Sequence, residues 1–423
     1  MTKKLQLDHI AKIEGHARLN VKIEDGEVKE ARMEVFESPR FFEAIVVGRS
    51  YEEIASMTSR ICGICGPSHT TCCLQAIEKA FDVKVSQQTK LLRELLNIGG
   101  WIQSHALHLF FLALPDYVGG TSVLDLPARY SKHVKRGLML KKLGNDIVTV
   151  IGGRDVHPMT AVPGGFSKLP TESKLQWLLQ ELKERKQEFV EAAAFWQKLK
   201  YPKFERKTEY FSLQKKNSYP LIDGHIRCFG EKCIQTKNYP RHFKEYLEPY
   251  STAKFAVAEG KSYMVGPLAR LNLNYKELSY NAKRALKTKT PIQNPFYNNV
   301  AQAVEMVWCV DRAIQILENL KLKDEQRPEI KPKAGRGYAT VEAPRGLLFH
   351  EYKFNKSGCV LDSNIIVPTA QNLRQIEDDI KLLLPGILKL KKEKIVDQLE
   401  KLIRAYDPCI SCSTHFLEVE GLP

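Results

Sequence analysis

Two short cysteine segments near opposite ends of the chain limit its fold more than any other feature. The first is Cys62-Gly-Ile-Cys65 and the second is Cys409-Ile-Ser-Cys412. Two residues between cysteines let both sulfurs face one metal ion, and soft thiolates favour nickel, iron, zinc or copper(I) over hard cations. The pairs are 409 − 65 = 344 positions apart, so a shared metal requires a fold that brings both ends of the chain together.

A histidine follows each cysteine pair, His69 after the first and His415 after the second. Small zinc modules usually close their two pairs over a dozen or two residues, so this spacing is not that of a local finger. One such pair alone is equally consistent with structural zinc and with no metal at all. Two pairs, each with a trailing histidine, indicate a metal centre.

The overall composition is that of a globular protein. The chain has 423 residues, of which 43% are hydrophobic and 27% are charged, enough for a large core. Its ten cysteines fall in metal-type pairs, which suits a reducing cytoplasm. The longest apolar run, about 106–114, is too short to span a bilayer, and no apolar run follows Met1. We therefore expect a cytoplasmic chain without a transmembrane segment.

The net charge of +15 raises the question of nucleic-acid binding, because basic surfaces attract phosphate. Acidic and basic residues are interspersed along this chain, and it carries no zinc finger, RNA-recognition signature or arginine-rich arm. The sequence therefore favours a lysine-rich surface over a nucleic-acid partner.

Periodicity predicts the main secondary-structure elements. Alternating apolar residues predict a β-hairpin over 17–35, with its turn at Asp25-Gly26. Long helices are predicted over 86–114, 175–199 and 296–322, and Pro115 is expected to end the first of them. A strand, turn and strand are predicted over 337–350, followed by two amphipathic helices, 371–384 and 387–404, broken at Pro385-Gly386.

Six separated sequence blocks resemble the large subunit of nickel-iron hydrogenases, over nearly the whole chain. The blocks are Ile13-Glu-Gly-His16, Pro39-Arg-Phe-Phe-Glu43, Arg60-Ile-Cys-Gly-Ile-Cys65, Ser104-His-x-x-His108, Glu342-Ala-Pro-Arg-Gly346 and Asp407-Pro-Cys-x-x-Cys-x-x-His415. The resemblance implies a mainly α-helical fold (α+β overall), a long-helix bundle with small peripheral β-sheets. It also implies one domain over 1–423, with a peripheral α/β elaboration at about 200–292 and a C-terminal propeptide at 416–423.

The resemblance implies that the four cysteines hold nickel and iron. Cys62 and Cys409 would be terminal nickel ligands, and Cys65 and Cys412 would bridge nickel to an iron that carries cyanide and carbonyl ligands. On this basis the chain catalyses the reversible heterolytic cleavage of H2.

A third metal, magnesium or iron, is also implied, held by Glu43 and His415. Hard carboxylate oxygens suit magnesium. From the residues alone, Glu43 is equally a charge on a helix surface.

The resemblance assigns the proton chemistry to three residues. Cys409 or Arg345 would take the proton first, and Glu14 would relay it, although a glutamate in a loop is more often simply solvated. The guanidinium of Arg345, which lies between Pro344 and Gly346, would hang over the open metal position.

Three further residues are expected near the metals without binding them. Asp407 and Asp116 would both pair with the active-site arginine, and His69 would donate an N–H toward a bridging sulfur. His105 and His108 are expected nearby as core histidines. Cys72 and Cys73 are interpreted as packed core thiols, and Cys228 and Cys233 as free thiols.

The resemblance also implies partners. The chain has no cysteine run for an iron–sulfur cluster beyond the four ligands, so an iron–sulfur small subunit, with further electron-transfer subunits, would carry electrons to NAD(P), deazaflavin or another soluble carrier. Nickel-insertion proteins, and an endopeptidase that cuts after His415, would mature the chain. Three alternatives remain: a membrane-bound energy-converting hydrogenase, the quinone-reducing subunit of complex I, which lacks these cysteines, and a non-catalytic four-cysteine metal protein.

Overall fold

The computed structural model describes residues 2–228 and 233–414. Its N-terminal sheet has three antiparallel strands, β1 (Thr2–Leu7), β2 (Ala17–Glu24) and β3 (Glu27–Val35), in the order β1-β2-β3. The predicted hairpin is confirmed, and both Asp25 and Gly26 adopt positive φ at its turn. The strand β1 was not predicted.

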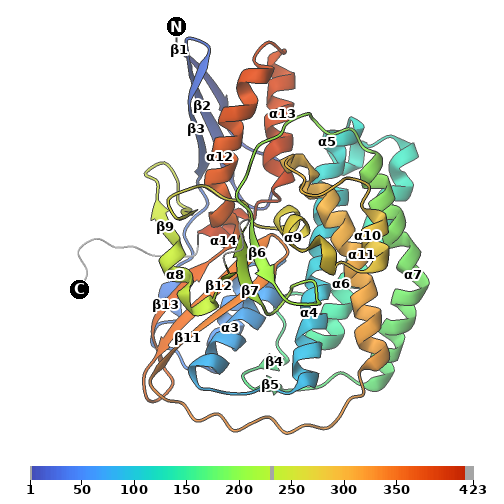
Figure 1. The fold of residues 1–423 in the computed structure, drawn as a ribbon, viewed down its shortest axis with the longest axis vertical. Coiled ribbons are helices and arrows are strands. Elements are labelled where there is room, and N and C mark those ends of the chain that lie inside the picture. The colour runs from blue at the N-terminus through green and yellow to red at the C-terminus, as the bar shows by residue number, and fades with distance from the viewer. Residues whose placement is uncertain (1, 229–232, 415–423) are drawn as a thin grey trace.

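Four long helices pack side by side and form most of one half of the molecule (Figure 1). They are α4 (Gln87–Leu107), α6 (Ser131–Gly152), α7 (Glu172–Lys198) and α11 (Asn298–Asn319). The helices α4 and α6 approach so closely that a Cβ on Gly144 would lie 2.5 Å from the backbone nitrogen of Gln103. The predicted long-helix bundle with small separate sheets is confirmed.

The helix at 86–114 does not stop at Pro115, and that prediction was wrong. After α4 the chain widens into a π-helical segment, His108–Ala113, and continues as α5 (Leu114–Val118) with Pro115 in its first turn. A proline has no N–H to donate and its ring crowds the preceding turn. The wider π turn accommodates both effects, and such turns are frequent at functional sites.

A second three-stranded sheet lies near the centre of the chain. It consists of β11 (Gly335–Ala343), β12 (Gly346–Phe354) and β13 (Val360–Ile366) in the order β11-β12-β13, so the predicted strand, turn and strand are confirmed. The helix α3 (Gly66–Ala80) packs on this sheet. A Cβ on Gly337 would lie only 1.9 Å from the carbonyl oxygen of Ala76, which explains a glycine there.

The C-terminal part is helical: α12 (Pro368–Ile387), α13 (Lys392–Ala405) and the short α14 (Ile410–Ser413). The predicted break at Pro385-Gly386 was wrong, because α12 continues past Pro385 to Ile387. Pro385 lies in the last turn of α12. Among the described residues, no helix is both long enough and apolar enough to cross a bilayer.

The other elements are short. Those before residue 200 are α1 (Phe42–Ile45), α2 (Ile54–Thr58), β4 (Ala161–Val162) and β5 (Gly165–Phe166). Those after it are β6 (Phe211–Gln214), β7 (His225–Cys228), β8 (Cys233–Ile234), α8 (Tyr239–His242), β9 (Phe243–Leu247), β10 (Lys254–Ala258), α9 (Pro267–Asn274) and α10 (Tyr280–Ala285). The stretch 200–292 is only partly peripheral, because Arg270 on α9 is fully buried at the centre of the molecule.

Candidate metal centre

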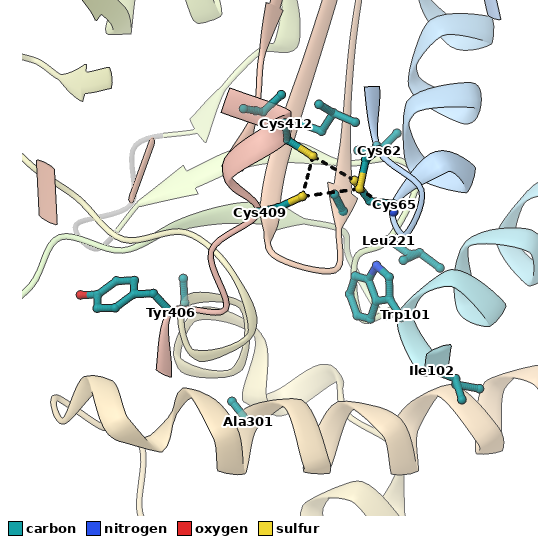
Figure 2. Close-up of a cluster of buried hydrophobic side chains, with 14 of the residues drawn as sticks. Cys62, Cys65, Trp101, Ile102, Leu221, Ala301, Tyr406, Cys409 and Cys412 are labelled. Atoms are coloured by element: carbon teal, nitrogen blue, oxygen red, sulfur yellow. Dashed lines mark hydrogen bonds between the residues drawn. The ribbon is translucent and has the colours of Figure 1, made fainter. Parts of the chain in front are cut away.

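The four cysteines of the two pairs meet inside the protein (Figure 2). The sulfurs of Cys62 and Cys409 are 3.5 Å apart, those of Cys65 and Cys412 are 3.7 Å apart, and those of Cys409 and Cys412 are 2.8 Å apart. Thiolates around a tetrahedral metal with bonds of about 2.3 Å are separated by about 3.8 Å. All four are buried. Two of these three distances therefore fit shared metal ligands.

The first pair lies where a turn leads into α3. Cys65 caps the start of α3, and the backbone N–H groups of Ile64 and Cys65 donate to the sulfur of Cys62 at 3.3 and 3.1 Å. Backbone donors and a helix N-terminus both favour a negative sulfur. Hydrogen bonds from the other three cysteines hold the pKa of Cys62 well below its ordinary value, whereas burial raises the pKa of Cys412. A bound cation would let all four ionise.

The second pair is held against the N-terminal segment of the chain. Glu14 and Cys409 form a parallel β-bridge, and the N–H of Ile410 donates to the carbonyl of Glu14 at 2.9 Å. Gly15 has a φ of +84°, and a Cβ there would lie 2.7 Å from the Cβ of Ile410. Only glycine satisfies both conditions without strain. The sequence predicted that the chain ends would meet, and they do.

The carboxylate of Glu14 lies beside the second pair. It accepts a hydrogen bond from the backbone N–H of Ser411 at 3.0 Å and another from the Ser411 hydroxyl. Ser411 stands directly before Cys412. Glu14 is therefore an anchored carboxylate and not a freely solvated one.

Arg345 extends from the turn between β11 and β12 toward Asp407. Its Nε donates to the backbone carbonyl of Asp407 at 2.6 Å, and its Nη2 donates to Oδ1 at 2.8 Å. Burial opposes the charge of Arg345, but Asp407 and the nearby sulfurs of Cys409 and Cys62 outweigh it and raise its pKa. Its buried Nη1 has no partner within 2–228 and 233–414. An orphaned donor beside four cysteines fits an anionic ligand at the metals.

The expected pairing of Asp116 with the active-site arginine was wrong. Asp116 binds Arg404 on α13 at 2.5 and 3.0 Å and Lys12 at 2.5 Å. The side chain of Arg404 reaches α5, and these two cations already occupy the Asp116 carboxylate. Asp407 alone fulfils that expectation.

His69 lies beside the cysteines, as expected. One of its ring nitrogens falls within 4.8 Å of the sulfurs of Cys65 and Cys412. Its Nδ1 lies 3.1 Å from Nε2 of His350, whose Nδ1 lies 2.6 Å from the hydroxyl of Tyr352. The position agrees with the sequence expectation, whereas donation to a sulfur stays a prediction.

Glu43 binds a cation, but this cation is a side chain. Its carboxylate pairs with the ammonium of Lys254 at 2.9 Å and accepts from the N–H of Ile365 at 2.7 Å. Lys254 also pairs with Glu245 at 3.1 Å. His415, the other expected ligand of the third metal, lies outside the described residues.

The remaining cysteines do not join the centre. Cys72 and Cys73 are fully buried on α3, and burial raises both pKa values, that of Cys73 to about 12. They are packed core thiols, as predicted. Cys228 is buried and Cys233 is exposed.

Sequence reasoning missed Arg270, which supports the Arg345 turn. Arg270 donates to both carboxylate oxygens of Glu305 at 2.7 Å, to Glu342 at 2.9 Å, and to the carbonyls of Ala343 and Pro344 at 2.9 Å. Its guanidinium also lies 4.0 Å from the ring centre of Trp101. Pro344 therefore acts through its carbonyl. No motif marks Arg270, because its partners lie 35 to 74 positions away.

Arg40 was also missed, although it lies in one of the six blocks. Its Nη2 donates to the carbonyl of Ile61 at 2.5 Å and to the carbonyl of Ser411. These residues directly precede Cys62 and Cys412. Arg40 therefore joins the two cysteine segments, and its place inside a block was the only signal in the sequence.

Comparisons with known proteins agree with this geometry. A family model described as nickel-dependent hydrogenase matches residues 40–137 and 230–415. The alpha subunit of sulfhydrogenase 1 from Pyrococcus furiosus is 35% identical, covering 98% of each chain. The corresponding vhc subunit of the F420-non-reducing hydrogenase from Methanococcus voltae is 31% identical, covering 99% of this chain and 96% of that one.

A solved structure, that of an NAD+-reducing [NiFe]-hydrogenase in the H2-reduced state, is similar with a TM-score of 0.90 and 28% identity. The match covers 98% of this chain and 99% of the other. The Ni-Fe-Se hydrogenase of D. vulgaris Hildenborough shares the fold, with a TM-score of 0.80 at 24% identity.

Proposed function

Since this chain belongs to the nickel-dependent hydrogenase family, in which it is a catalytic large subunit, we propose that Cys62, Cys65, Cys409 and Cys412 hold its nickel and iron. The observation that carries this proposal is the convergence of four buried sulfurs from two segments 344 positions apart. When bound, nickel and iron supply the site at which H2 is split. The rest of the chemistry belongs to the chain's own residues.

Arg345 binds and orients diatomic ligands of the iron. The buried Nη1 of Arg345 has no partner in the described part of the chain. Cyanide is an acceptor that such a donor can bind, and a guanidinium holds an anion without itself titrating. This supports an iron with cyanide and carbonyl ligands.

The proton leaves through Cys409 and Glu14. A thiolate beside a cationic centre has a lowered proton affinity and can pass a proton on. The Glu14 backbone pairs with Cys409, and its carboxylate binds Ser411 between the two cysteines. The carboxylate is therefore at hand to receive the proton.

A third metal on Glu43 and His415 is part of the proposal. The cluster of Glu43, Glu245 and Lys254 contains two carboxylates and one ammonium, so one negative charge is left, and a hard divalent cation fits it. Such an ion would share the Glu43 carboxylate with Lys254. Metal analysis that finds magnesium or iron beyond the nickel-iron pair would support it, and removal of Lys254 must then not abolish this binding.

Electrons leave through partner proteins. The relatives are named as individual subunits of hydrogenases, and the name of one contains the term iron-sulfur. We propose an iron–sulfur small subunit, further electron-transfer subunits and a soluble carrier such as NAD(P), since one similar structure is titled NAD+-reducing. The carrier places the complex in the cytoplasm. We further propose that nickel-insertion proteins and an endopeptidase acting after His415 complete the chain.

The test is metal analysis and infrared spectroscopy of the chain purified with its native partners, together with H2-dependent reduction of NAD(P). One nickel and one iron per chain, with sharp cyanide and carbonyl bands, are expected. Zinc alone, without such bands or H2 uptake after full maturation, would overturn the proposal. Activity with a carrier other than NAD(P) would overturn only the choice of carrier.

A further inference from the structure

His108 is a buried histidine that the proposed chemistry does not use. It begins the π-helical segment, and it is 1% exposed. Its two ring nitrogens each have one close neighbour. Nδ1 lies 2.6 Å from Oε1 of Gln302 on α11, and Nε2 lies 2.7 Å from the carbonyl oxygen of Arg404 on α13.

The contact at Nε2 fixes the first proton. A backbone carbonyl only accepts hydrogen bonds, so Nε2 of His108 must carry a hydrogen and donate it to Arg404. A neutral ring then has no hydrogen left for Nδ1, which would have to accept one.

The contact at Nδ1 fixes the second proton, because Asp407 sets the orientation of Gln302. The Nε2 amide nitrogen of Gln302 donates to Oδ2 of Asp407 at 3.0 Å. Turning the amide over would set its oxygen against a carboxylate whose other oxygen is paired with Arg345. The amide oxygen must therefore face His108, and an amide oxygen only accepts.

Burial opposes a charged ring, but the surroundings favour it. The carbonyl of Arg404 lies in the last turn of α13, the negative end of the helix dipole, where a histidine cation is stabilised. The carboxylate of Asp407 lies one side chain away. The Arg404 guanidinium is neutralised by Asp116 and Glu400.

One further pair lies on the same faces of the neighbouring helices. Glu305, one turn beyond Gln302 on α11, binds His105, one turn before His108 on α4, at 3.0 Å.

We propose that His108 is a permanent imidazolium, with a proton on each ring nitrogen, and that it is a positioning residue for the active-site arginine. It holds the Gln302 amide in one orientation, Gln302 holds Asp407, and Asp407 holds Arg345 beside the cysteines. The protonation state stands independently of the proposed function, whereas the positioning role rests on it.

The protonation state is tested by 15N NMR of the complete complex, with the histidine ring nitrogens of this chain labelled. An imidazolium gives two signals in the protonated range, and a neutral ring gives one protonated and one bare nitrogen. At about pH 8, above the usual histidine pKa of about 6.5, we expect one histidine with two protonated nitrogens, and His108→Gln removes it. A spectrum in which this signal pair is missing from the intact complex overturns the inference.

Gln302→Leu provides a second assignment that does not depend on the folding of H108Q. It removes the acceptor at Nδ1, so the same histidine must lose its second proton. If the histidine keeps both protons in this variant, the argument from Gln302 is wrong.

The positioning role is tested by the kinetics of H108Q against H133Q. His133 is a half-buried histidine on α6 that stacks on Phe195. We expect H108Q to lower kcat by about 100-fold, as a misplaced catalytic group does, while KM for H2, nickel and iron stay unchanged. Full activity in H108Q would overturn the positioning role. Loss of metal from H108Q would overturn it too, since the residue would then serve folding.

Discussion

Glu14 and Ser411 are joined by two hydrogen bonds although they lie 397 positions apart, and these bonds place a carboxylate between the two C-terminal cysteines. The backbone of Glu14 pairs with Cys409 as well. The sequence block that contains Glu14 is therefore held by the same residues that bind the metal. Its carboxylate is oriented by the cysteine segment itself.

Replacing Glu14 by glutamine tests the proton route. The amide can keep the hydrogen bond to Ser411 but cannot take up a proton. We expect H2 oxidation to fall by about 10² to 10⁴, the usual contribution of a general acid or base, with nickel and iron retained. Hydrogen uptake and metal content, measured on the same preparation, check this.

Glu37→Gln is the matched control for Glu14→Gln. Glu37 accepts from the backbone N–H of His16, in the same N-terminal segment, at 3.1 Å. Its replacement should leave turnover unchanged. Equal losses in both variants would mean that the segment, and not the Glu14 carboxyl, is what matters.

How far the sequence could predict this site depends on where each contact originates. Cys62, Cys409 and Glu14 could be found because their motifs are local and their chemistry is distinctive. Arg270 could not be found, because only the tertiary structure brings α9 against the turn that carries Arg345. Asp116 was assigned to the wrong arginine for the same reason. A carboxylate binds the nearest cation in space, and here that cation is Arg404.

The fold shows the same limit. Hydrophobic alternation and helical periodicity located the hairpin and the long helices, because these patterns depend only on which face is buried. Proline rules failed at Pro115 and Pro385. In both places the chain keeps its helical path, by a π turn in one case and by placing proline in the last turn in the other.

Replacing Arg270 by methionine should destabilise the protein. Arg270, Glu305 and Glu342 are all fully buried, and Arg270 pairs with both carboxylates. Without it two buried carboxylates lack a counter-charge, and breaking a buried pair in this way costs about 3 to 5 kcal/mol. Denaturant unfolding measures the change. Arg312→Met is the control, since Arg312 pairs with Glu94 near the surface, and it should cost less than about 1 kcal/mol.

Glu377 makes the stability depend on pH. Burial raises its pKa to about 7, while it accepts from the N–H of Met33 and the hydroxyl of Tyr250. Between its unfolded pKa of about 4.5 and about 7 the folded state binds the extra proton, so stability falls as pH rises. The contribution is complete below pH 4.5 and lost above 7, and it amounts to about 3 kcal/mol.

The variant Glu377→Gln isolates this contribution. It should flatten the decline in unfolding free energy between about pH 5 and 8, whereas Glu24→Gln, at an exposed carboxylate, should leave the decline in place. Unfolding by denaturant at several pH values provides the data. An unchanged slope in E377Q would show that another group binds the proton.

Replacing Arg40 by methionine should loosen the metal centre before it affects the fold. The Arg40 guanidinium donates to the carbonyls before Cys62 and before Cys412, so it fixes the distance between the two cysteine segments. Supporting residues of this kind contribute about 10- to 100-fold to metal affinity. We therefore expect nickel to be lost to a chelator sooner in R40M, with the melting temperature of the metal-free chain unchanged. Arg49→Met, at an exposed position nearby, is the control. Nickel retention in R40M equal to that of the wild type would mean that the four sulfurs hold the two segments together unaided.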